Sequence, residues 1–338
     1  MERLVNIGGG GLAGLSLGIA LRQTGAPVVL HEAGVYPRHR VCGEFISGVS
    51  PAVLETLGIA DLVQDAKRHF SSAWYFRERT VYRTQLPSAV GISRYALDER
   101  LAVRFRELDG ILKECSRMKE KSGAGIVWCG GRKPMKGRWI GLKCHVSGLD
   151  LSADLEMHLA ANGYIGLAKI EDGKVNVCGL FRRQPKLAGK GTQTLERYLH
   201  AGGLEGIAGR IFSAKVDEGS FLGVAGFSLG RPSTKSDAIL TLGDAWGMIP
   251  PFTGNGMSMA FESAAIALEP LRSWQHGRET WEQALSRIQN RLAERFARRM
   301  FWARMMHPFL TTAAGQAFFT LVSRSGLLPF NACLHAVR

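Results

Sequence analysis

The chain has 338 residues, 46% of them hydrophobic, so it can bury a large core and form two closely joined domains. Its 43 lysines and arginines against 29 acids give a net charge of +14, which favours an anionic partner. The six scattered cysteines include no C-x-x-C pair, which argues against a zinc site or a disulfide framework and for a reducing, cytoplasmic location. We therefore expect no metal site. No run of residues is long and apolar enough to cross a bilayer.

The first motif is a glycine-rich turn between a short apolar strand at residues 4–7 and a helix at residues 12–24. The turn has the G-x-G-x-x-G spacing typical of dinucleotide binding, with Gly9, Gly11 and Gly14. The first glycine permits a sharp turn, the second lets backbone amides approach a pyrophosphate, and the third lets the helix pack on the sheet. The positive end of the helix dipole then faces the phosphates.

A second apolar strand, residues 28–30, leads to Glu32. An acid about 20 residues after the glycines accepts hydrogen bonds from the ribose hydroxyls of an adenosine. A carboxylate also disfavours a 2′-phosphate, which argues against NADP in this site. The first 32 residues therefore predict a Rossmann-like unit that binds an adenine dinucleotide.

The next loop, residues 36–47, reads YPRHRVCGEFIS. Its cations Arg38 and Arg40 are suited to neutralising phosphate charge. Its Cys-Gly-Glu sequence places the thiol of Cys42 and the carboxylate of Glu44 beside a flexible backbone.

The glycine turn followed by this loop resembles FAD-dependent oxidoreductases that include the geranylgeranyl reductases and, more distantly, the aromatic hydroxylases of the para-hydroxybenzoate hydroxylase fold. The resemblance implies noncovalent FAD and places the Cys-Gly pair against the flavin ring. We therefore nominate Cys42 and Glu44 as catalytic residues. For Cys42 the alternative is a small buried hydrophobe.

Two later segments also resemble this superfamily. The pattern S-R-Y-x-L-D-x-x-L-A resembles the segment that re-enters the cofactor domain, which implies that Arg94 approaches the ribityl chain or pyrophosphate of FAD. The alternative is a surface arginine that caps a helix.

A buried strand at residues 239–242 ends in Gly243 and Asp244, like the Gly-Asp motif whose acid binds the ribityl hydroxyls. The following loop points backbone amides at the flavin edge from the start of a helix near Met257. The expected cofactor-binding residues are Gly9, Gly11, Gly14, Glu32, Arg40, Arg94, Gly243, Asp244, Pro251, Gly254, Asn255 and Gly256.

The chain departs from the superfamily at two places. Where the family has an Asp-Gly or Thr-Gly pair before an arginine, residues 126–132 read IVWCGGR and lack the acid. In the hydroxylases this pair is tied to FAD and NADPH handling, so its absence argues against hydroxylation driven by NAD(P)H. The Tyr-x-Trp-x-Phe-Pro signature of geranylgeranyl reductases is reduced to Tyr164, so we do not carry over their isoprenoid substrate.

The middle of the chain predicts an antiparallel sheet with one face on the substrate and the other in solvent. A hairpin turns at residues 77–79, and Asp172-Gly173 is a second hairpin turn. Further strands are expected at residues 139–143, 155–159, 164–170, 175–180 and 221–225, and helices at 50–63, 96–108, 194–199 and 207–212. The predicted fold class is α/β: a Rossmann-like FAD-binding domain (1–70, 91–138 and 232–275), a mainly antiparallel β-sheet substrate domain (71–90 and 139–231) and C-terminal helices (276–338).

The C-terminal segment has an apolar stripe and an arginine-rich face. The stripe contains Leu285, Ile288, Leu292, Phe296 and Met300, and the other face contains Arg287, Arg291, Arg295, Arg298 and Arg299. One interpretation is core packing beside solvated arginines. The other is an amphipathic surface that attaches reversibly to an anionic membrane through the arginines of residues 287–304 and the aromatic residues that follow.

The sequence thus predicts an FAD-dependent oxidoreductase that acts on a lipophilic or aromatic small molecule. It favours reduction of a carbon–carbon double bond, with a hydride from reduced flavin and a proton from a nearby acid. The alternatives are a flavin monooxygenase of the same fold and a degenerate FAD-binding protein without catalytic activity. NAD(P)H or another reductant supplies the electrons. We expect a monomer or dimer and, because no nucleic-acid motif accompanies the charge, no nucleic-acid partner.

Overall fold

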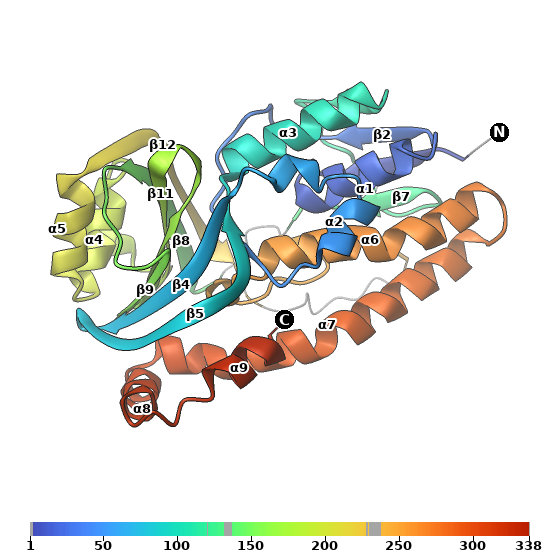
Figure 1. Ribbon diagram of the computed structural model, residues 1–338. Helices are drawn as coiled ribbons and strands as arrows, with labels where there is room; N and C mark the ends of the chain where they lie inside the picture. Colours follow the sequence, from blue (N-terminus) through green and yellow to red (C-terminus); the bar gives the residue numbers. More distant parts are fainter. Residues whose placement is uncertain (1–2, 120, 132–136, 228, 230–237, 338) are drawn as a thin grey trace.

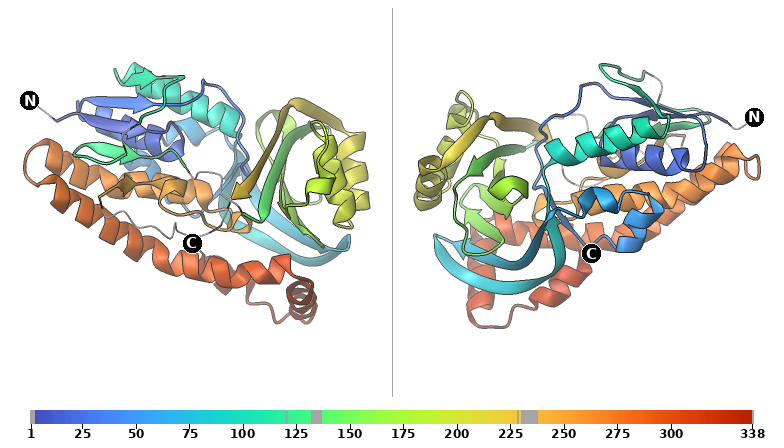
Figure 2. Two further views of the ribbon diagram at one scale, coloured as in Figure 1. Left: turned by 180° about the vertical axis from the view of Figure 1, so that it is seen from behind. Right: turned by 45° about the horizontal axis from the view of Figure 1, so that its top comes forward.

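The structure, a computed structural model, describes residues 3–337 except 120, 132–136, 228 and 230–237. It contains a parallel sheet, sheet A, and a larger curled sheet, sheet B, which lie side by side (Figure 1). A long helix, α7 (Trp281–Thr311), runs along one side of the molecule from the end near sheet A to the end near sheet B (Figure 2).

Sheet A has five parallel strands in the order β13-β7-β1-β2-β6. Their bounds are β1 (Val5–Gly8), β2 (Val28–His31), β6 (Ile111–Lys113), β7 (Ile126–Trp128) and β13 (Leu240–Thr241). Helix α1 (Leu12–Arg22) is buried along ten of its eleven residues, because it packs between this sheet and helix α6 (Gly256–Gln275). The sequence did not predict β6, which is only three residues long and has an exposed isoleucine, Ile111.

Sheet B has eight strands in the order β12-β8-β11-β10-β9-β4-β5-β3, and all neighbours are antiparallel except β4 and β9. The bounds are β3 (Phe45–Ser47), β4 (Lys67–Phe76), β5 (Arg79–Gly91), β8 (Trp139–Ser147), β9 (Leu155–Ala160), β10 (Gly163–Lys169), β11 (Lys174–Arg182) and β12 (Lys215–Phe227). Both predicted hairpin turns are present. Arg77 and Glu78 have positive φ between β4 and β5, and Asp172 and Gly173 have positive φ between β10 and β11.

Both faces of β8 are buried, which corrects the prediction that one face of this sheet meets solvent. Leu142, Cys144 and Val146 pack beneath helices α4 (Gln193–Ala201) and α5 (Glu205–Ser213). The alternating residues Lys143 and His145 point to the opposite face, yet they are only 0% and 3% exposed. The polar face is buried because the loop that follows β2 lies against it.

Helix α3 (Arg94–Glu107) begins where Ser93 accepts a hydrogen bond from the amide of Ala96. The helix expected at residues 50–63 is instead divided into α2 (Pro51–Thr56) and a 3₁₀ turn (Asp61–Val63). The division falls at Gly58, whose φ of 67° is incompatible with a continuous helix.

The apolar stripe of α7 packs in the core, with Leu285, Ile288, Leu292, Phe296 and Met300 all buried. Most of the arginine face pairs with acids of α6. Arg295 and Arg299 contact Glu262, and Arg287 and Arg291 contact Glu269. The apolar stripe therefore packs as the first interpretation of this segment expected, but these four arginines join two helices instead of being solvated. Helices α8 (Ala313–Arg324) and α9 (Phe330–Ala336) complete the chain.

Among the described residues, no helix combines the length and the apolar character needed to cross a membrane.

Candidate functional site

An open space, which we call the cradle, lies in front of the first turn of α1 between Gly9, Gly11, Gly14 and Arg94. Gly11 is the N-terminal cap of this helix and provides no side chain to bond its amides. A Cβ added at Gly11 would meet only the guanidinium of Arg94, at 3.9 Å. Gly9 has a φ of 114°, and a Cβ on Gly14 would lie 2.1 Å from the carbonyl oxygen of Gly9, so both positions require glycine. Uncapped amides beside an arginine suit a pyrophosphate.

Glu32 is the acid at the end of β2, and it is almost fully buried. Its oxygens accept hydrogen bonds from the amides of Gly10 and Gly34, each at 2.9 Å, and pair with Arg38 at 2.5 Å and Arg40 at 3.4 Å. Burial alone would raise the pKa of Glu32, but the charge of Arg40 and the other partners lower it, so the carboxylate is ionised. The contact with Arg40 is the longest of the four.

Arg94 is held beside the cradle by Asp98, a fully buried acid that the sequence analysis did not single out. Asp98 accepts hydrogen bonds from Arg94 at 2.6 and 2.8 Å and from Arg40 at 2.8 Å. Arg94 is therefore a partly buried cation held by two hydrogen bonds to Asp98 rather than a surface arginine that caps the helix. The i,i+4 spacing of Arg94 and Asp98 on one helix was the available signal.

The second glycine motif lies against the first turn of α1. Gly243 has a φ of 59°, and a Cβ there would lie 3.1 Å from the side chain of Ala13. Asp244, in the short 3₁₀ turn that follows β13, is exposed. The Gly-Asp motif and the glycine turn, more than 200 residues apart in sequence, thus lie side by side.

The loop before α6 faces the same region. Pro251 begins a 3₁₀ turn, and Gly254 follows it with a φ of 66°. Asn255 is fully buried; its amide nitrogen donates to the carbonyl oxygen of Val337, and within the described structure its Oδ1 has no hydrogen-bond partner. A Cβ added at Gly256 would meet no atom within 4 Å. The open backbone at Gly256 fits the polar edge of a flavin.

A buried cluster of charged side chains connects the loop of residues 36–47 to sheet B. Oε1 of Glu44 accepts hydrogen bonds from the amide of Arg94, at 2.9 Å, and pairs with the ammonium of Lys143, at 3.2 Å. Its Oε2 lies 2.6 Å from Nε2 of His145. Burial would raise the pKa of Glu44, but the hydrogen bond from His145 and the charge of Lys143 lower it. Because an ionised carboxylate only accepts, Nε2 of His145 carries the proton.

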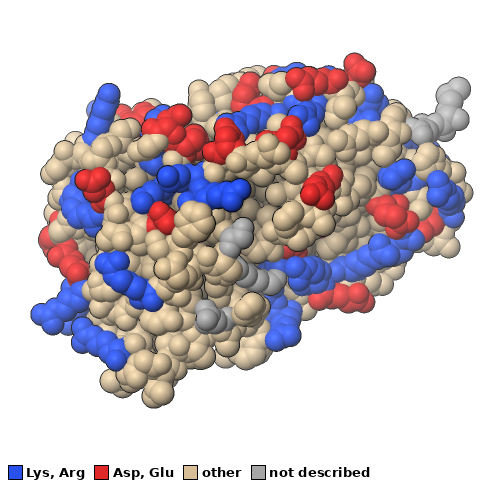
Figure 3. All heavy atoms as spheres, viewed as in Figure 1, with Lys and Arg blue, Asp and Glu red and all other residues tan. Residues whose placement is uncertain are grey.

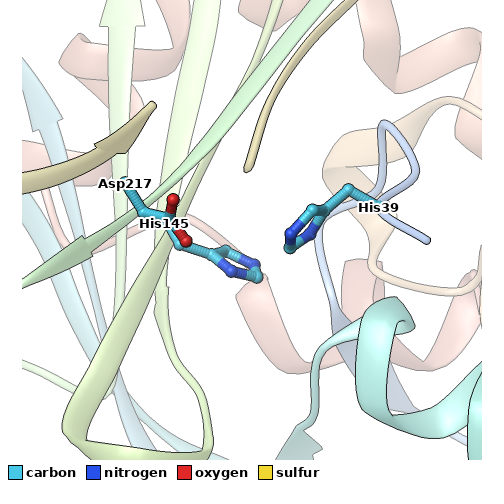
Figure 4. A group of neighbouring side chains, drawn as sticks. All are labelled: His39, His145 and Asp217. Carbon is cyan, nitrogen blue, oxygen red and sulfur yellow. The ribbon is translucent and has the colours of Figure 1, made fainter. Parts of the chain in front are cut away.

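His145 faces His39 and Asp217, which come from the loop after β2 and from β12 (Figure 4). The potential ligand atoms of the three lie within 4.8 Å of one another, the kind of arrangement that can hold a metal ion, although the sequence predicted none. However, the ammonium of Lys143 is 3.2 Å from Nδ1 of His39 and opposes a second cation there. Burial and this ammonium lower the pKa of His39 to about 4, so its ring is neutral near pH 7. The cluster is better suited to proton transfer than to metal binding.

Cys42 lies at the edge of this cluster and is partly buried. Its sulfur accepts a hydrogen bond from the amide of Glu44, and its carbonyl oxygen accepts one from Asn176 of β11. Burial raises the pKa of the thiol, so Cys42 is protonated at neutral pH and is not a thiolate nucleophile.

The segment after β7 closes over the glycine turn. A Cβ on Gly9 would lie 2.5 Å from the backbone of Cys129, and burial raises the pKa of that thiol to about 12. Arg132, which the sequence analysis matched to the family arginine, lies outside the described residues. Sequence reasoning also missed Lys143 and His145, for which the alternating polar residues of β8 were the signal, and His39 of the loop after β2.

No protein-family model matches this chain, and no curated protein matches it. Solved structures do. HpxO from Klebsiella pneumoniae, complexed with FAD and uric acid, is similar over 99% of this chain and 96% of its own, with 15% identity and a TM-score of 0.74. PqsL from P. aeruginosa, in complex with 2-aminobenzoylacetate, is similar over 94% of this chain and 99% of its own, with 16% identity and a TM-score of 0.72. The myxobacterial chondrochloren halogenase CndH, a variant of FAD-dependent halogenases, is similar over 98% of this chain and 87% of its own, with 16% identity and a TM-score of 0.73.

These likenesses show the fold. The chain has the FAD-binding hydroxylase fold, which confirms the predicted α/β class with its parallel sheet, mainly antiparallel sheet and C-terminal helices. The finer resemblance to geranylgeranyl reductases finds no support among these structures.

Proposed function

We propose that this protein is an FAD-dependent monooxygenase that acts on a lipophilic or aromatic small molecule. The observation that carries the proposal is a continuous path of contacts from the dinucleotide cradle to a buried proton-transfer cluster. Arg94 lies beside Gly11, its amide donates to Glu44, and Glu44 holds His145. Structures of the same fold contain FAD with uric acid, or 2-aminobenzoylacetate.

This proposal reverses the order in which the sequence ranked the two reactions. Reduction of a double bond required a proton from a nearby acid, and Glu44 was the acid among the two nominated catalytic residues. However, Glu44 is ionised and engaged by three partners, so it has no proton to give. The solved structures of the same fold include oxygenases, which favours hydroxylation over reduction.

FAD fits the residues of the cradle. Gly9, Gly11, Gly14 and Arg94 suit the pyrophosphate, Glu32 with Arg40 suits the adenosine ribose, and Gly243 with Asp244 suits the ribityl chain. Pro251, Gly254, Asn255 and Gly256 are assigned to the flavin edge. When bound and reduced by NAD(P)H or another donor, FAD would supply the activation of oxygen and its transfer to the substrate.

The residues of the cluster have distinct roles. Glu44 fixes the tautomer of His145, because its carboxylate engages Nε2–H and leaves Nδ1 as a proton acceptor. Nδ1 can then remove a proton from a hydroxyl or amino group of the substrate, which makes an aromatic ring more reactive towards an electrophilic oxygen. The hydrogen bond from His145 and the charge of Lys143 together keep Glu44 ionised. Glu44 and Lys143 are positioning residues, and His145 is the catalytic base.

The reaction is tested by adding candidate aromatic and lipid-like compounds to the FAD-loaded protein with NADPH in air. We expect a true substrate to stimulate oxygen uptake without a matching release of hydrogen peroxide, because the oxygen enters the product. A compound that reoxidises dithionite-reduced protein in the absence of oxygen would instead indicate a reductase. A protein that binds FAD but responds to no compound in either assay would support the non-catalytic alternative.

FAD binding is tested by substituting valine for Gly11. The backbone at Gly11, with a φ of −86°, accepts a side chain, so the variant should fold normally while the valine fills the pyrophosphate cradle. We expect a loss of about 1–3 kcal/mol of FAD binding, which is about 5- to 150-fold in Kd by fluorescence titration. The matched control is Gly209→Val on α5, where an added Cβ meets nothing within 4 Å. Equal FAD affinity in the two variants would contradict the assigned cradle.

A further inference from the structure

A large apolar surface remains exposed at the C-terminal end of the molecule. It consists of the side chains of Phe301, Trp302, Met305, Phe309, Phe318, Leu321 and Leu327, which are 40–76% exposed. We call this set the C-terminal apolar surface. The rings of Phe309 on α7 and Phe318 on α8 are 5.6 Å apart, so the surface continues from one helix to the next. Monomeric proteins rarely leave a contiguous apolar area of this kind in water.

Helical spacing separates this surface from the core stripe of α7. Residues 298, 301, 302, 305 and 309 follow the i, i+3, i+4, i+7, i+11 pattern of one helix face, and all five are exposed. The buried side chains Leu292, Phe296 and Ala303 lie on another face. The exposed aromatic residues are therefore not the margin of the core but a separate face.

The chain segment that forms this surface has charges of one sign. From residue 295 to residue 338 the sequence contains no aspartate or glutamate, but it has six arginines. Two of them, Arg295 and Arg299, pair with Glu262 of α6. Arg298, Arg304 and Arg324 are exposed on α7 and α8. In Figure 3 the lobe at the lower left, where α8 lies, shows uncharged side chains and no acidic ones.

We propose that the C-terminal apolar surface docks on the anionic face of a lipid bilayer. Aromatic side chains next to arginines match the chemistry of an interface at which hydrocarbon meets anionic headgroups. A second copy of the chain is a poorer occupant. In a symmetric dimer the same surface meets itself, and the arginines of the two copies would be brought together.

The proposal changes the residues to which the sequence analysis assigned attachment. Arg287 and Arg291 pair with Glu269, and Arg295 and Arg299 pair with Glu262, so these four are committed to helix packing. The residues proposed to contact the membrane are instead Arg298, Arg304 and Arg324 together with the exposed aromatic residues.

Flotation of the full chain with vesicles tests this docking independently of the flavin chemistry. We expect the protein to float with phosphatidylglycerol-containing vesicles at low salt, and to remain at the bottom at high salt or with phosphatidylcholine alone. The triple variant R298Q/R304Q/R324Q should lower the partition coefficient about 100-fold, because each arginine contributes about fivefold. A second variant, F301S/W302S/F309S, should lower it even at low salt, and circular dichroism verifies that both variants fold.

The matched control removes three positive charges from exposed positions near the edge of sheet A, as K113Q/R117Q/K119Q. We expect its binding to stay close to that of the wild type. Three outcomes would overturn the proposal: no flotation of the wild type at low salt, an equal loss in the control, or a solution dimer without lipid binding that F301S/W302S/F309S dissociates. The last would make a second copy the occupant of this face.

Discussion

Replacing His145 by alanine is expected to lower the rate of substrate turnover by about 10²- to 10⁴-fold, the usual contribution of a positioned general base. The variant should still fold and bind FAD, because Glu44 keeps its contacts with Lys143 and the amide of Arg94. The measurement is the rate of oxygen uptake with a substrate identified as above, together with an FAD titration. A base role also predicts that added imidazole restores part of the lost rate.

The control for this variant is His200→Ala, since His200 is an exposed histidine on α4. Its turnover should match that of the wild type. If His145→Ala also turned over at the wild-type rate, or if imidazole changed both variants equally, His145 would be a structural residue of β8 rather than the base. Failure of both proteins to bind FAD would instead count against the proposed cofactor.

The cofactor side of the fold was predictable because its signals are local. Gly9, Gly11 and Gly14 occur within six residues, and Gly9 and Gly14 have geometric reasons to lack a side chain. Strand, turn and helix then follow from short-range patterns. The contact between Gly243 and the first turn of α1 could be expected only because the family resemblance supplied the long-range pairing.

The proton-transfer cluster could not be predicted in the same way. Leu142, Lys143, Cys144, His145 and Val146 alternate apolar and polar side chains, which is typical of a strand with one face in water. The polar face is buried by a partner, Glu44, that precedes His145 by 101 positions. The alternation of residues within β8 does not predict that contact with Glu44.

The arginines of α7 show the same limit. Their spacing defines a helix face but not what covers it. The covering acids, Glu262 and Glu269, are on α6, and the tight turn between the helices brings them into register with Arg287, Arg291, Arg295 and Arg299. A membrane-binding face and a helix-packing face have the same sequence pattern until the partner helix is known.

Removing either member of the Lys143–Glu44 pair is expected to reduce the free energy of unfolding by about 3–5 kcal/mol, since the other charge stays buried without its partner. Both side chains are fully buried and 3.2 Å apart. The variants are Glu44→Gln and Lys143→Met, compared in urea denaturation followed by circular dichroism. The control is Asp61→Asn, which breaks the exposed pair with Arg104 and should cost at most about 1 kcal/mol.

The double variant E44Q/K143M and the pH dependence of stability separate this ion pair from simple packing. Because neither charge remains, the double variant should lose less free energy of unfolding than the sum of the losses in the two single variants.

The folded-state pKa of Glu44 lies below its ordinary value of 4.5, so its stabilisation is fully present above about pH 4.5 and is lost as the pH falls through the folded pKa. Glu44→Gln should therefore flatten the acid limb of the wild-type stability profile. Strictly additive losses with an unchanged acid limb would mean that Glu44 and Lys143 stabilise the junction only by their volume, and the assignment of Lys143 as a group that keeps Glu44 ionised would fail.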